Sequence, residues 1–313
     1  MNQLVWRLHR NQAFVAVGAL AVLAVILLVT GITMADDYRN TLASCAAQNC
    51  GSVPSSSLFR GDGAIMDLVD ATIAVPLLFG LFWGAPLLAK EFEDGTHNLA
   101  WTQGVSRRRW LRANVAWSLV AAALWGAALA ALVSWWRFPE NALDSRFGAF
   151  DIQGIVPVAY ALFAVTLGVA VGSVVRRVLP SLAVTLAIFV AIRVAVGLYL
   201  RPHFLTPVTK VLPLLGSSPA GAWVISSDMV NGHGQNLGAS WDVNGLPAAC
   251  SSSFPGGKGV NGPCLAAHGF HQILTYQPDS RFWAFQGMEA GIFLVLAVVL
   301  VGFTFWWVRT RDA

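Results

Sequence analysis

Charged residues are scarce in this sequence. Only 12% of its 313 residues are Asp, Glu, Lys or Arg, whereas 56% are hydrophobic, and the mean hydropathy is +0.61. A soluble domain carries about 25% charged residues, so this composition is typical of a protein whose main solvent is lipid. The formal net charge of +4 is small, and there is no basic stripe interleaved with exposed aromatic residues, which argues against nucleic-acid binding.

The familiar catalytic motifs are missing as well. The sequence contains no Gly-x-x-x-x-Gly-Lys-Ser/Thr phosphate loop, no His-Glu-x-x-His zinc helix and no Gly-x-Ser-x-Gly elbow. Its nearest approach to a phosphate loop, residues 256–259, lacks the leading glycine and the hydroxyl residue. We therefore predict that the chain is not an enzyme on its own, with no catalytic residue, no metal site and no bound cofactor.

Long apolar runs are what the sequence has in place of these motifs. A helix needs roughly 20 apolar residues to cross the hydrocarbon core, and backbone polar groups in lipid must be paired within the segment. The sequence therefore predicts an all-α, polytopic membrane protein with six transmembrane helices. The predicted spans are residues 13–34, 68–89, 113–136, 155–175, 179–200 and 290–308.

The distribution of basic residues predicts the orientation, because Lys and Arg concentrate in short cytoplasmic loops. One set lies densely on four short segments: Arg7, Arg10, Lys90, Arg107, Arg108, Arg109, Arg112, Arg176, Arg177, Arg309 and Arg311. The other set is spread over longer stretches: Arg39, Arg60, Arg137, Arg146, Arg201, Lys210, Lys258 and Arg281. We predict a multi-pass protein of the plasma membrane with both termini in the cytoplasm.

The cysteines agree with this topology. Cys45 and Cys50 fall in the first predicted outside loop, and Cys250 and Cys264 in the last. Disulfides persist outside the cytosol, although four cysteines allow three connectivities. We favour the local pairs over a link between the loops. A zinc site is the lesser alternative, because the short Cys-x-x-Cys spacing of common structural sites is absent.

Two segments outside the spans are long enough to have structure of their own. Residues 1–12 are amphipathic and predict a helix lying on the membrane surface, with a frayed basic tail as the alternative. Residues 201–286 are too long for a simple connector and predict an extracellular cap within a single permease domain, 1–313. Pro207, Pro213 and Pro219 favour short broken helices at its start, residues 204–224.

Ionisable residues within spans are expensive, at roughly 3 kcal/mol for a charge at the bilayer centre. Arg193 lies inside the fifth predicted span, and Glu289 and Asp70 lie near the outer ends of the sixth and second. We expect an Arg193–Glu289 pair, with Asp70 as the second choice of partner and substrate contact by Arg193 as an alternative. The spacing of Gly168 and Gly172 is a weak signal for helix association.

A polar island, residues 90–110, separates the second and third spans. Gly95 and Gly104 bound a short amphipathic segment, and Thr96 can cap a helix there. Arg107, Arg108 and Arg109 follow, where anionic lipid head groups would hold them. The pattern favours a small helix presented to a cytosolic partner, and a plain interfacial hairpin remains the alternative.

The island, EDGTHNLAWTQGVSRRRW at residues 93–110, resembles the first cytoplasmic loop of actinobacterial type-2 ABC exporter permeases. WRLHRNQ at residues 6–12, YQPDSRFW at 276–283 and FWWVR at 305–309 are similar to theirs as well. The resemblance implies six helices, a surface-lying N-terminal helix and a coupling helix at residues 96–103 that docks on a separate cytosolic ABC ATPase.

The same resemblance implies partners and roles. ATP and Mg²⁺ would be bound by the partner ATPase, and a second permease, identical or homologous, would complete the pathway among the membrane lipids. The implied coupling residues are Glu93, Gly95, Thr96, His97, Leu99, Trp101, Gln103, Arg107 and Arg108. We therefore expect an exporter permease for a lipophilic compound, lipid or peptide. The alternative is a non-transporting sensor or mechanotransmission subunit with a ligand-binding outer loop.

Overall fold

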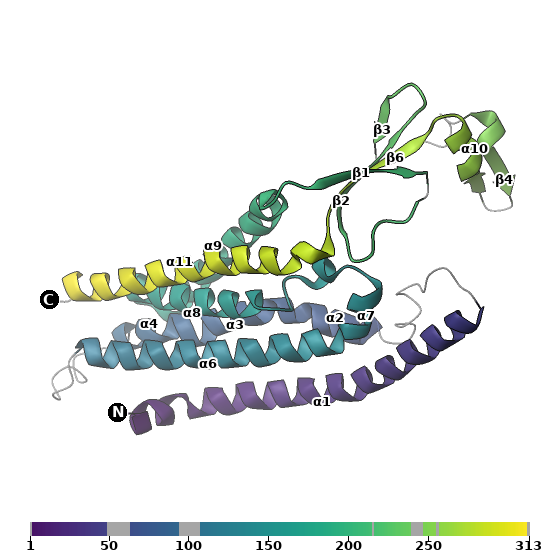
Figure 1. Ribbon diagram of the computed structural model, residues 1–313. Coiled ribbons are helices and arrows are strands. Elements are labelled where there is room, and N and C mark those ends of the chain that lie inside the picture. Colours follow the sequence, from purple (N-terminus) through teal and green to yellow (C-terminus); the bar gives the residue numbers. More distant parts are fainter. Residues whose placement is uncertain are drawn as a thin grey trace. The chain divides into compact units, whose positions relative to one another are not determined.

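The computed structural model describes residues 2–48, 63–93, 107–214, 216–238, 247–254 and 257–311 (Figure 1). The chain divides into two compact units, which are described separately. Unit 1 comprises Met1–Glu140, Ala149–Arg201 and Trp283–Ala313, and unit 2 comprises Asn141–Gly148 and Pro202–Phe282. Unit 2 covers nearly the same residues as the predicted cap, 201–286.

Unit 1 is a bundle of long helices. By length and composition, six helices among the described residues can cross a membrane, which confirms the predicted number. They are α1 (Asn2–Gln48), the series α2–η2–α3–η3–α4 (Gly63–Ala71, Thr72–Ala74, Val75–Phe79, Gly80–Gly84, Ala85–Glu93), α6 (Arg107–Trp136), α8 (Val156–Val175), α9 (Val178–Ala195) continuing through η5 (Val196–Leu200) and η6 (Arg201–His203), and α11 (Phe282–Arg311).

Helix α8 forms the centre of the bundle. In the most apolar 18-residue stretch of α8, 78% of the residues are buried, whereas in the corresponding stretch of α1 only 6% are buried. A hydrophobic cluster beside it contains Phe79, Leu111, Val115, Val165 and Val169, contributed by three of the spans. The outward faces of α1, α9 and α11 carry exposed Val, Leu and Ile side chains, as expected of surfaces solvated by lipid.

Glycines allow the second span to pack directly on α8. A Cβ atom on Gly168 would lie 2.4 Å from the Gly80 carbonyl oxygen, and one on Gly172 would lie 2.5 Å from that of Ala85. Gly80 and Gly84 open and close the π-helical turn η3 and make equally close contacts with α8. The Gly168–Gly172 spacing therefore does mark a helix contact, because only glycine lets the two backbones approach so closely.

Helix α1 is the most peripheral span and is continuous from Asn2 to Gln48. Residues 2–12 are helical and continue into α1, and the candidate span begins only at Ala13; that residues 2–12 lie on the membrane surface stays a prediction. Two indole groups of α6 attach α1: Trp125 Nε1 donates to the Ala16 carbonyl at 3.0 Å, and Trp136 Nε1 donates to Thr30 Oγ1 at 3.0 Å. Hydrogen bonds of this kind suit a membrane interior, where an indole N–H must find a partner.

Unit 2 is built around an antiparallel sheet with strand order β1–β6–β2–β3. The strands are β1 (Val208–Pro213), β2 (Trp223–Val230), β3 (Asn236–Gly238) and β6 (His271–Gln277). A hairpin of β4 (Ser251–Phe254) and β5 (Gly257–Val260) and the short helices η8 (Ala248–Cys250), α10 (Gly262–Ala267) and η9 (Asp279–Arg281) complete it, and α7 (Phe138–Leu143) and η4 (Arg146–Ala149) lie at the borders of the two units.

The broken helices predicted for residues 204–224 are therefore wrong, and unit 2 is not all-α. Val208, Thr209 and Val211 are β-branched and favour a strand. Pro213 ends β1 on the edge of the sheet, where the missing N–H costs least. Pairing with β6, more than 60 residues later in the chain, satisfies the rest of the backbone, and no local pattern in residues 204–224 indicates that partner.

Two further links hold unit 2 together. Cys250 and Cys264 form a disulfide with their Cα atoms 5.4 Å apart, which confirms the predicted local pair. Cys45 is also disulfide-bonded, and Cys50 lies outside the described residues. Arg146 clamps Asp279 through Nε at 2.8 Å and Nη2 at 2.6 Å, and its guanidinium lies 4.8 Å from the centre of the Phe282 ring.

Candidate functional site

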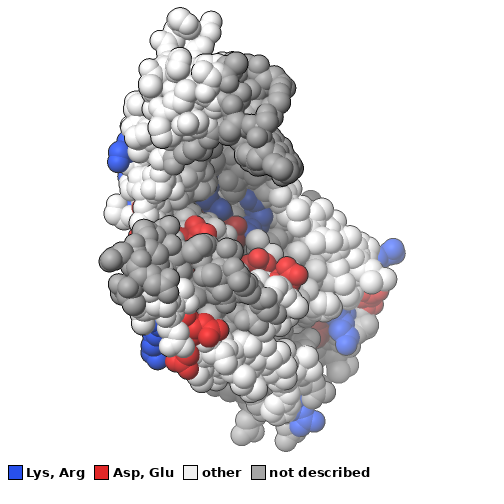
Figure 2. Space-filling view, turned by 90° about the vertical axis from the view of Figure 1, so that its right-hand side faces the viewer, with Lys and Arg blue, Asp and Glu red and all other residues white. Residues whose placement is uncertain are grey.

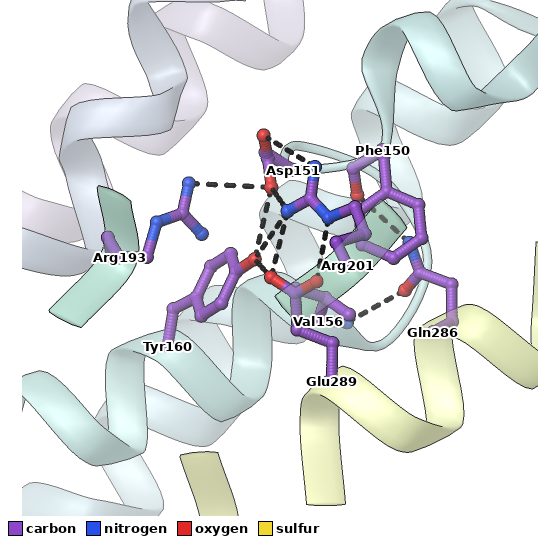
Figure 3. A network of polar contacts seen from close by, with 8 residues as sticks. All are labelled: Phe150, Asp151, Val156, Tyr160, Arg193, Arg201, Gln286 and Glu289. Carbon is purple, nitrogen blue, oxygen red and sulfur yellow. Dashed lines mark hydrogen bonds and ion pairs between the residues drawn. The ribbon is translucent and has the colours of Figure 1, made fainter. Parts of the chain in front are cut away.

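An ion cluster lies at one end of unit 1. It consists of Asp151, Tyr160, Arg193, Arg201 and Glu289, which converge in Figure 3. Asp151 precedes α8, Tyr160 is on the first turns of α8, Arg193 and Arg201 are on α9 and its continuation, and Glu289 is on α11. Ionisable groups at membrane depth are costly and mark functional sites by default. Charged residues make up only 12% of the sequence, and most of the described residues on the face in Figure 2 are uncharged.

The Arg201–Glu289 pair is the most buried part of the ion cluster. The Glu289 side chain is 1% exposed and that of Arg201 is 13% exposed. Arg201 donates from Nε to Glu289 Oε2 at 2.7 Å and from Nη2 to Oε1 at 2.8 Å. This two-pronged geometry is the strongest that a guanidinium and a carboxylate can make. The Tyr160 hydroxyl lies within hydrogen-bond distance of both Glu289 and Asp151, and it donates its single proton to one of them at a time.

Asp151 is the second carboxylate of the cluster. Arg201 Nη2 donates to its Oδ1, and Arg193 Nη2 lies 3.5 Å from the same oxygen. Burial alone would raise the pKa of Asp151, but the charges of Arg193 and Arg201, with hydrogen bonds from Arg201 and Tyr160, bring this pKa below its ordinary value. Asp151 is therefore ionised at neutral pH, so the ion cluster holds two positive and two negative charges.

Arg193 is only partly satisfied. Its guanidinium carbon lies 3.6 Å from the centre of the Tyr160 ring, a cation–π contact, and its Nη1 is buried with no hydrogen-bond partner among the described residues. The expected Arg193–Glu289 pair is wrong: Arg193 pairs with Asp151, and Glu289 pairs with Arg201. Arg201 follows Arg193 by about two helical turns, which places it at the level of Glu289.

Asp70 does not join the ion cluster. Its Oδ1 accepts from Arg137 Nη1 at 3.0 Å, and Arg137 also bridges to Glu140 at 2.8 Å. The Arg137 side chain is 7% exposed and that of Asp70 is 63% exposed. Asp70 therefore helps to neutralise a buried arginine at the end of α6. The second-choice prediction, that Asp70 pairs with Arg193, is wrong.

Gln286 fixes the segment that leads into α8 and carries Asp151. Its Oε1 accepts from the backbone N–H groups of Ile155 and Val156, both at 3.0 Å, and its Nε2 donates to the Phe150 carbonyl at 2.9 Å. These bonds cap the N-terminus of α8 with a side chain from α11, one turn before Glu289. The segment that carries Asp151 is thereby fixed between the two helices.

The sequence analysis found two members of the ion cluster and missed the others. Asp151 and Arg201 were assigned to loops, because each lies just beyond the end of a predicted span, and Tyr160 is a single polar tip in an apolar run. An acid immediately before one span and an arginine immediately after the next would have been the available signal. Only the packing of α8, α9 and α11 brings these positions together.

The ABC-2 membrane transporter related family model matches residues 17–201, more than half of the 313-residue chain. The chain belongs to this family. The match covers the first five spans, the island between the second and third, and the cluster residues except Glu289. Searches of curated proteins and of solved structures gave no match.

Membership of the ABC-2 family makes this chain the membrane component of a transporter, of the type that works with an ABC ATPase. The island is then the second segment of interest. Gly95, Thr96, His97, Leu99, Trp101 and Gln103 lie outside the described residues, and of Arg107 and Arg108 only the helical backbone is described. The coupling helix predicted at 96–103 therefore stays a prediction.

Glu93, the residue of the island that ends α4, has a defined contact. Its Oε2 accepts from the backbone N–H of Val178, the first residue of α9, at 2.8 Å. Arg177 at the N-cap position supplies no side-chain hydrogen bond, so Glu93 takes that place. Arg176 lies in the left-handed turn between α8 and α9, with φ of 59°, and its guanidinium is 4.8 Å from the centre of the Phe92 ring. The end of α4 thus contacts the start of α9.

One group of potential metal ligands occurs among the described residues of unit 2. The sulfur atoms of Cys250 and Cys264 and a ring nitrogen of His268 lie within 4.8 Å of one another. Both sulfurs are consumed in the disulfide, and a metal requires thiolates. His268 Nδ1 lies 2.9 Å from the Cys264 carbonyl oxygen, so its contacts are those of a structural histidine.

Proposed function

We propose that this chain is the transmembrane permease subunit of an ATP-driven exporter. Its substrate is a lipophilic compound, a lipid or a peptide, and its energy comes from a cytosolic ABC ATPase that docks on the coupling helix predicted at residues 96–103. Family membership and the six spans support the permease role. The absence of a phosphate loop from the sequence supports a separate ATPase. A second permease, identical or homologous, completes the pathway.

The Glu93–Val178 hydrogen bond is the observation that carries the mechanism. The predicted coupling helix, residues 96–103, begins three residues after Glu93, so a movement of that helix is passed directly to the end of α4. Through Glu93 it then reaches α9, whose helix runs without a break from Val178 to His203. Arg193 and Arg201 lie near the far end of that helix. A movement of the island is thereby transmitted across the membrane to the ion cluster.

At the far end of α9, the two arginines lie close to two carboxylates, those of Asp151 and Glu289. Arg201 already contacts both Asp151 and Glu289, and Arg193 has a guanidinium nitrogen that finds no hydrogen-bond partner in the described part of the chain. A small axial shift of α9 would exchange these contacts without leaving a charge unpaired. We propose that ATP binding drives this exchange and that it alters the packing of α9 against α8 and α11, which opens the outer part of the pathway.

The test begins with co-purification of the chain with the ABC ATPase encoded beside it, in nanodiscs, followed by measurements of ATPase rate and substrate flux. Leu99→Ala and Trp101→Ala should weaken the complex if residues 96–103 dock on the ATPase. Glu93→Ala should preserve the complex and lower flux per ATP hydrolysed, because it removes the acceptor for Val178. Glu93→Gln, which keeps an acceptor oxygen, is the matched control.

A stable complex with wild-type flux in Glu93→Ala would disprove the transmission route and leave the permease role intact. A failure of any ATPase to associate would contradict the permease role itself. The alternative function, a sensor or mechanotransmission subunit, is supported by the presence of a separate unit 2 with its own sheet and its own disulfide. Stimulated ATPase activity without measurable flux of any lipophilic substrate would select it.

A further inference from the structure

Unit 1 contains a large apolar cavity that the mechanism above does not use. Its volume is about 600 Å³, and it lies between α1, the α3–η3 segment and α6. Pockets that hold small ligands measure about 300–1,000 Å³. All of its lining residues are apolar or aromatic, and Val, Ala, Leu, Phe and Trp are the residue types present. The cavity is therefore of ligand size and without a charged group.

Its floor is a rigid aromatic surface. The rings of Phe79 and Trp83 are stacked with centroids 4.5 Å apart, and Trp125 contacts Phe79 at 5.0 Å. The indole N–H of Trp125 is already bonded to the Ala16 carbonyl, so the floor offers carbon rather than a free donor. The turn that carries Trp83 is held against α8 by Gly80 and Gly84, which prevents this floor from collapsing into the bundle.

The opposite wall is α1, which contacts α6 beside the cavity. Leu27 and Met34 are buried, at 0% and 2% exposed, in a cluster with α6. Toward the N-terminus, Ala16 and Ala19 line the cavity, and the Ala16 carbonyl accepts the hydrogen bond from Trp125. The small side chains of these two alanines leave the space between α1 and the aromatic floor unfilled.

We propose that this cavity binds one hydrocarbon chain of a membrane phospholipid. Its lining residues lie within the first three spans, so acyl chains surround it. Water finds few partners in a cavity lined almost entirely by carbon, and a peptide would leave backbone amides unpaired there. An acyl chain enters with its polar head group still at the membrane surface. It fills the cavity between α1 and the aromatic floor.

The experiment uses the full-length protein in nanodiscs that contain phosphatidylcholine with a diazirine group on one acyl chain. After irradiation, mass spectrometry locates the labelled residues. We expect labelling at Phe82 and Trp83 to exceed that at Val298 and Val299, which are 71% and 60% exposed on α11, by several-fold.

Substitution of Ala19 tests the location. Ala19→Phe and the milder Ala19→Leu place carbon in the cavity and should reduce labelling of Phe82 and Trp83 by about the same several-fold ratio. Ala21→Phe is the matched control, because Ala21 is exposed on α1 and does not line the cavity. Labelling no higher than at Val298, or unchanged by both Ala19 variants, would overturn the proposal. ATP is not needed, so the result is independent of transport.

Discussion

Replacement of Glu289 by glutamine tests whether the ion cluster holds the bundle together. The substitution keeps the size of the side chain and one acceptor oxygen but removes a charge that is 1% exposed. Arg201 then loses its bidentate partner and keeps only Asp151. Two positive charges and one negative charge then remain in the ion cluster, which in the wild type contains two of each.

The magnitude follows from the burial of the pair. Removal of one partner from a buried ion pair costs about 3–5 kcal/mol, because the other charge is left without compensation. Asp151 still neutralises part of the Arg201 charge, so we expect Glu289→Gln to lower the free energy of unfolding by about 3 kcal/mol. Arg201→Gln, which leaves the more buried Glu289 without a cation, should cost more. The double variant should cost less than the sum, by about 0.5–3 kcal/mol.

The measurement is the free energy of unfolding in mild detergent, followed by circular dichroism or tryptophan fluorescence during denaturation with SDS. Asp70→Asn is the control, because that ion pair has an exposed acid, at 63%, and Arg137 keeps Glu140. Exposed pairs contribute about 0–1 kcal/mol. A loss for Glu289→Gln no larger than for Asp70→Asn, or strictly additive single variants, would refute the argument that the ion cluster stabilises the bundle.

Three other predictions concern different links. Gly168→Val should destabilise unit 1 by about 3 kcal/mol, because its Cβ would meet the Gly80 carbonyl; Gly291→Val, with open space around the glycine, should be nearly neutral in the same unfolding assay. The pKa of Asp151 is lowered in the folded protein, so its contribution to stability is present above its unfolded pKa of about 3.9 and is lost as pH falls below it. The thermal midpoint should therefore be flat near pH 5–7 and fall near pH 4, less steeply in Asp151→Asn; equal slopes would contradict this. Cys250→Ser with Cys264→Ser should cost unit 2 about 3 kcal/mol and expose it to limited proteolysis while the spans stay protected; unchanged cleavage would count against the disulfide as its main link.

Much of the spanning architecture was accessible from sequence. Apolar length predicts the six helices because lipid leaves no other way to satisfy the backbone, and the observed spans overlap every predicted one. The local disulfide was favoured by the positions of the cysteines. The sheet of unit 2 was missed because β1 takes its hydrogen bonds from β6, and that pairing leaves no mark in residues 204–224.

The polar contacts show the same division. The sequence alone determined that Arg193, Glu289 and Asp70 needed neutralising partners, because a charge at membrane depth is costly whatever the fold. The spacing of Gly168 and Gly172 was also a weak signal that a helix packs there, and it could be read from sequence because both glycines lie on one helix. The identity of each partner was decided only by tertiary structure. Arg201, Asp151 and Tyr160 reach Glu289 through the packing of α8, α9 and α11, and Glu93 reaches Val178 across 85 positions of chain. Such contacts depend on the rotation and axial offset of each helix, which the interlocking of side chains and glycines sets and the apolar length of a span does not.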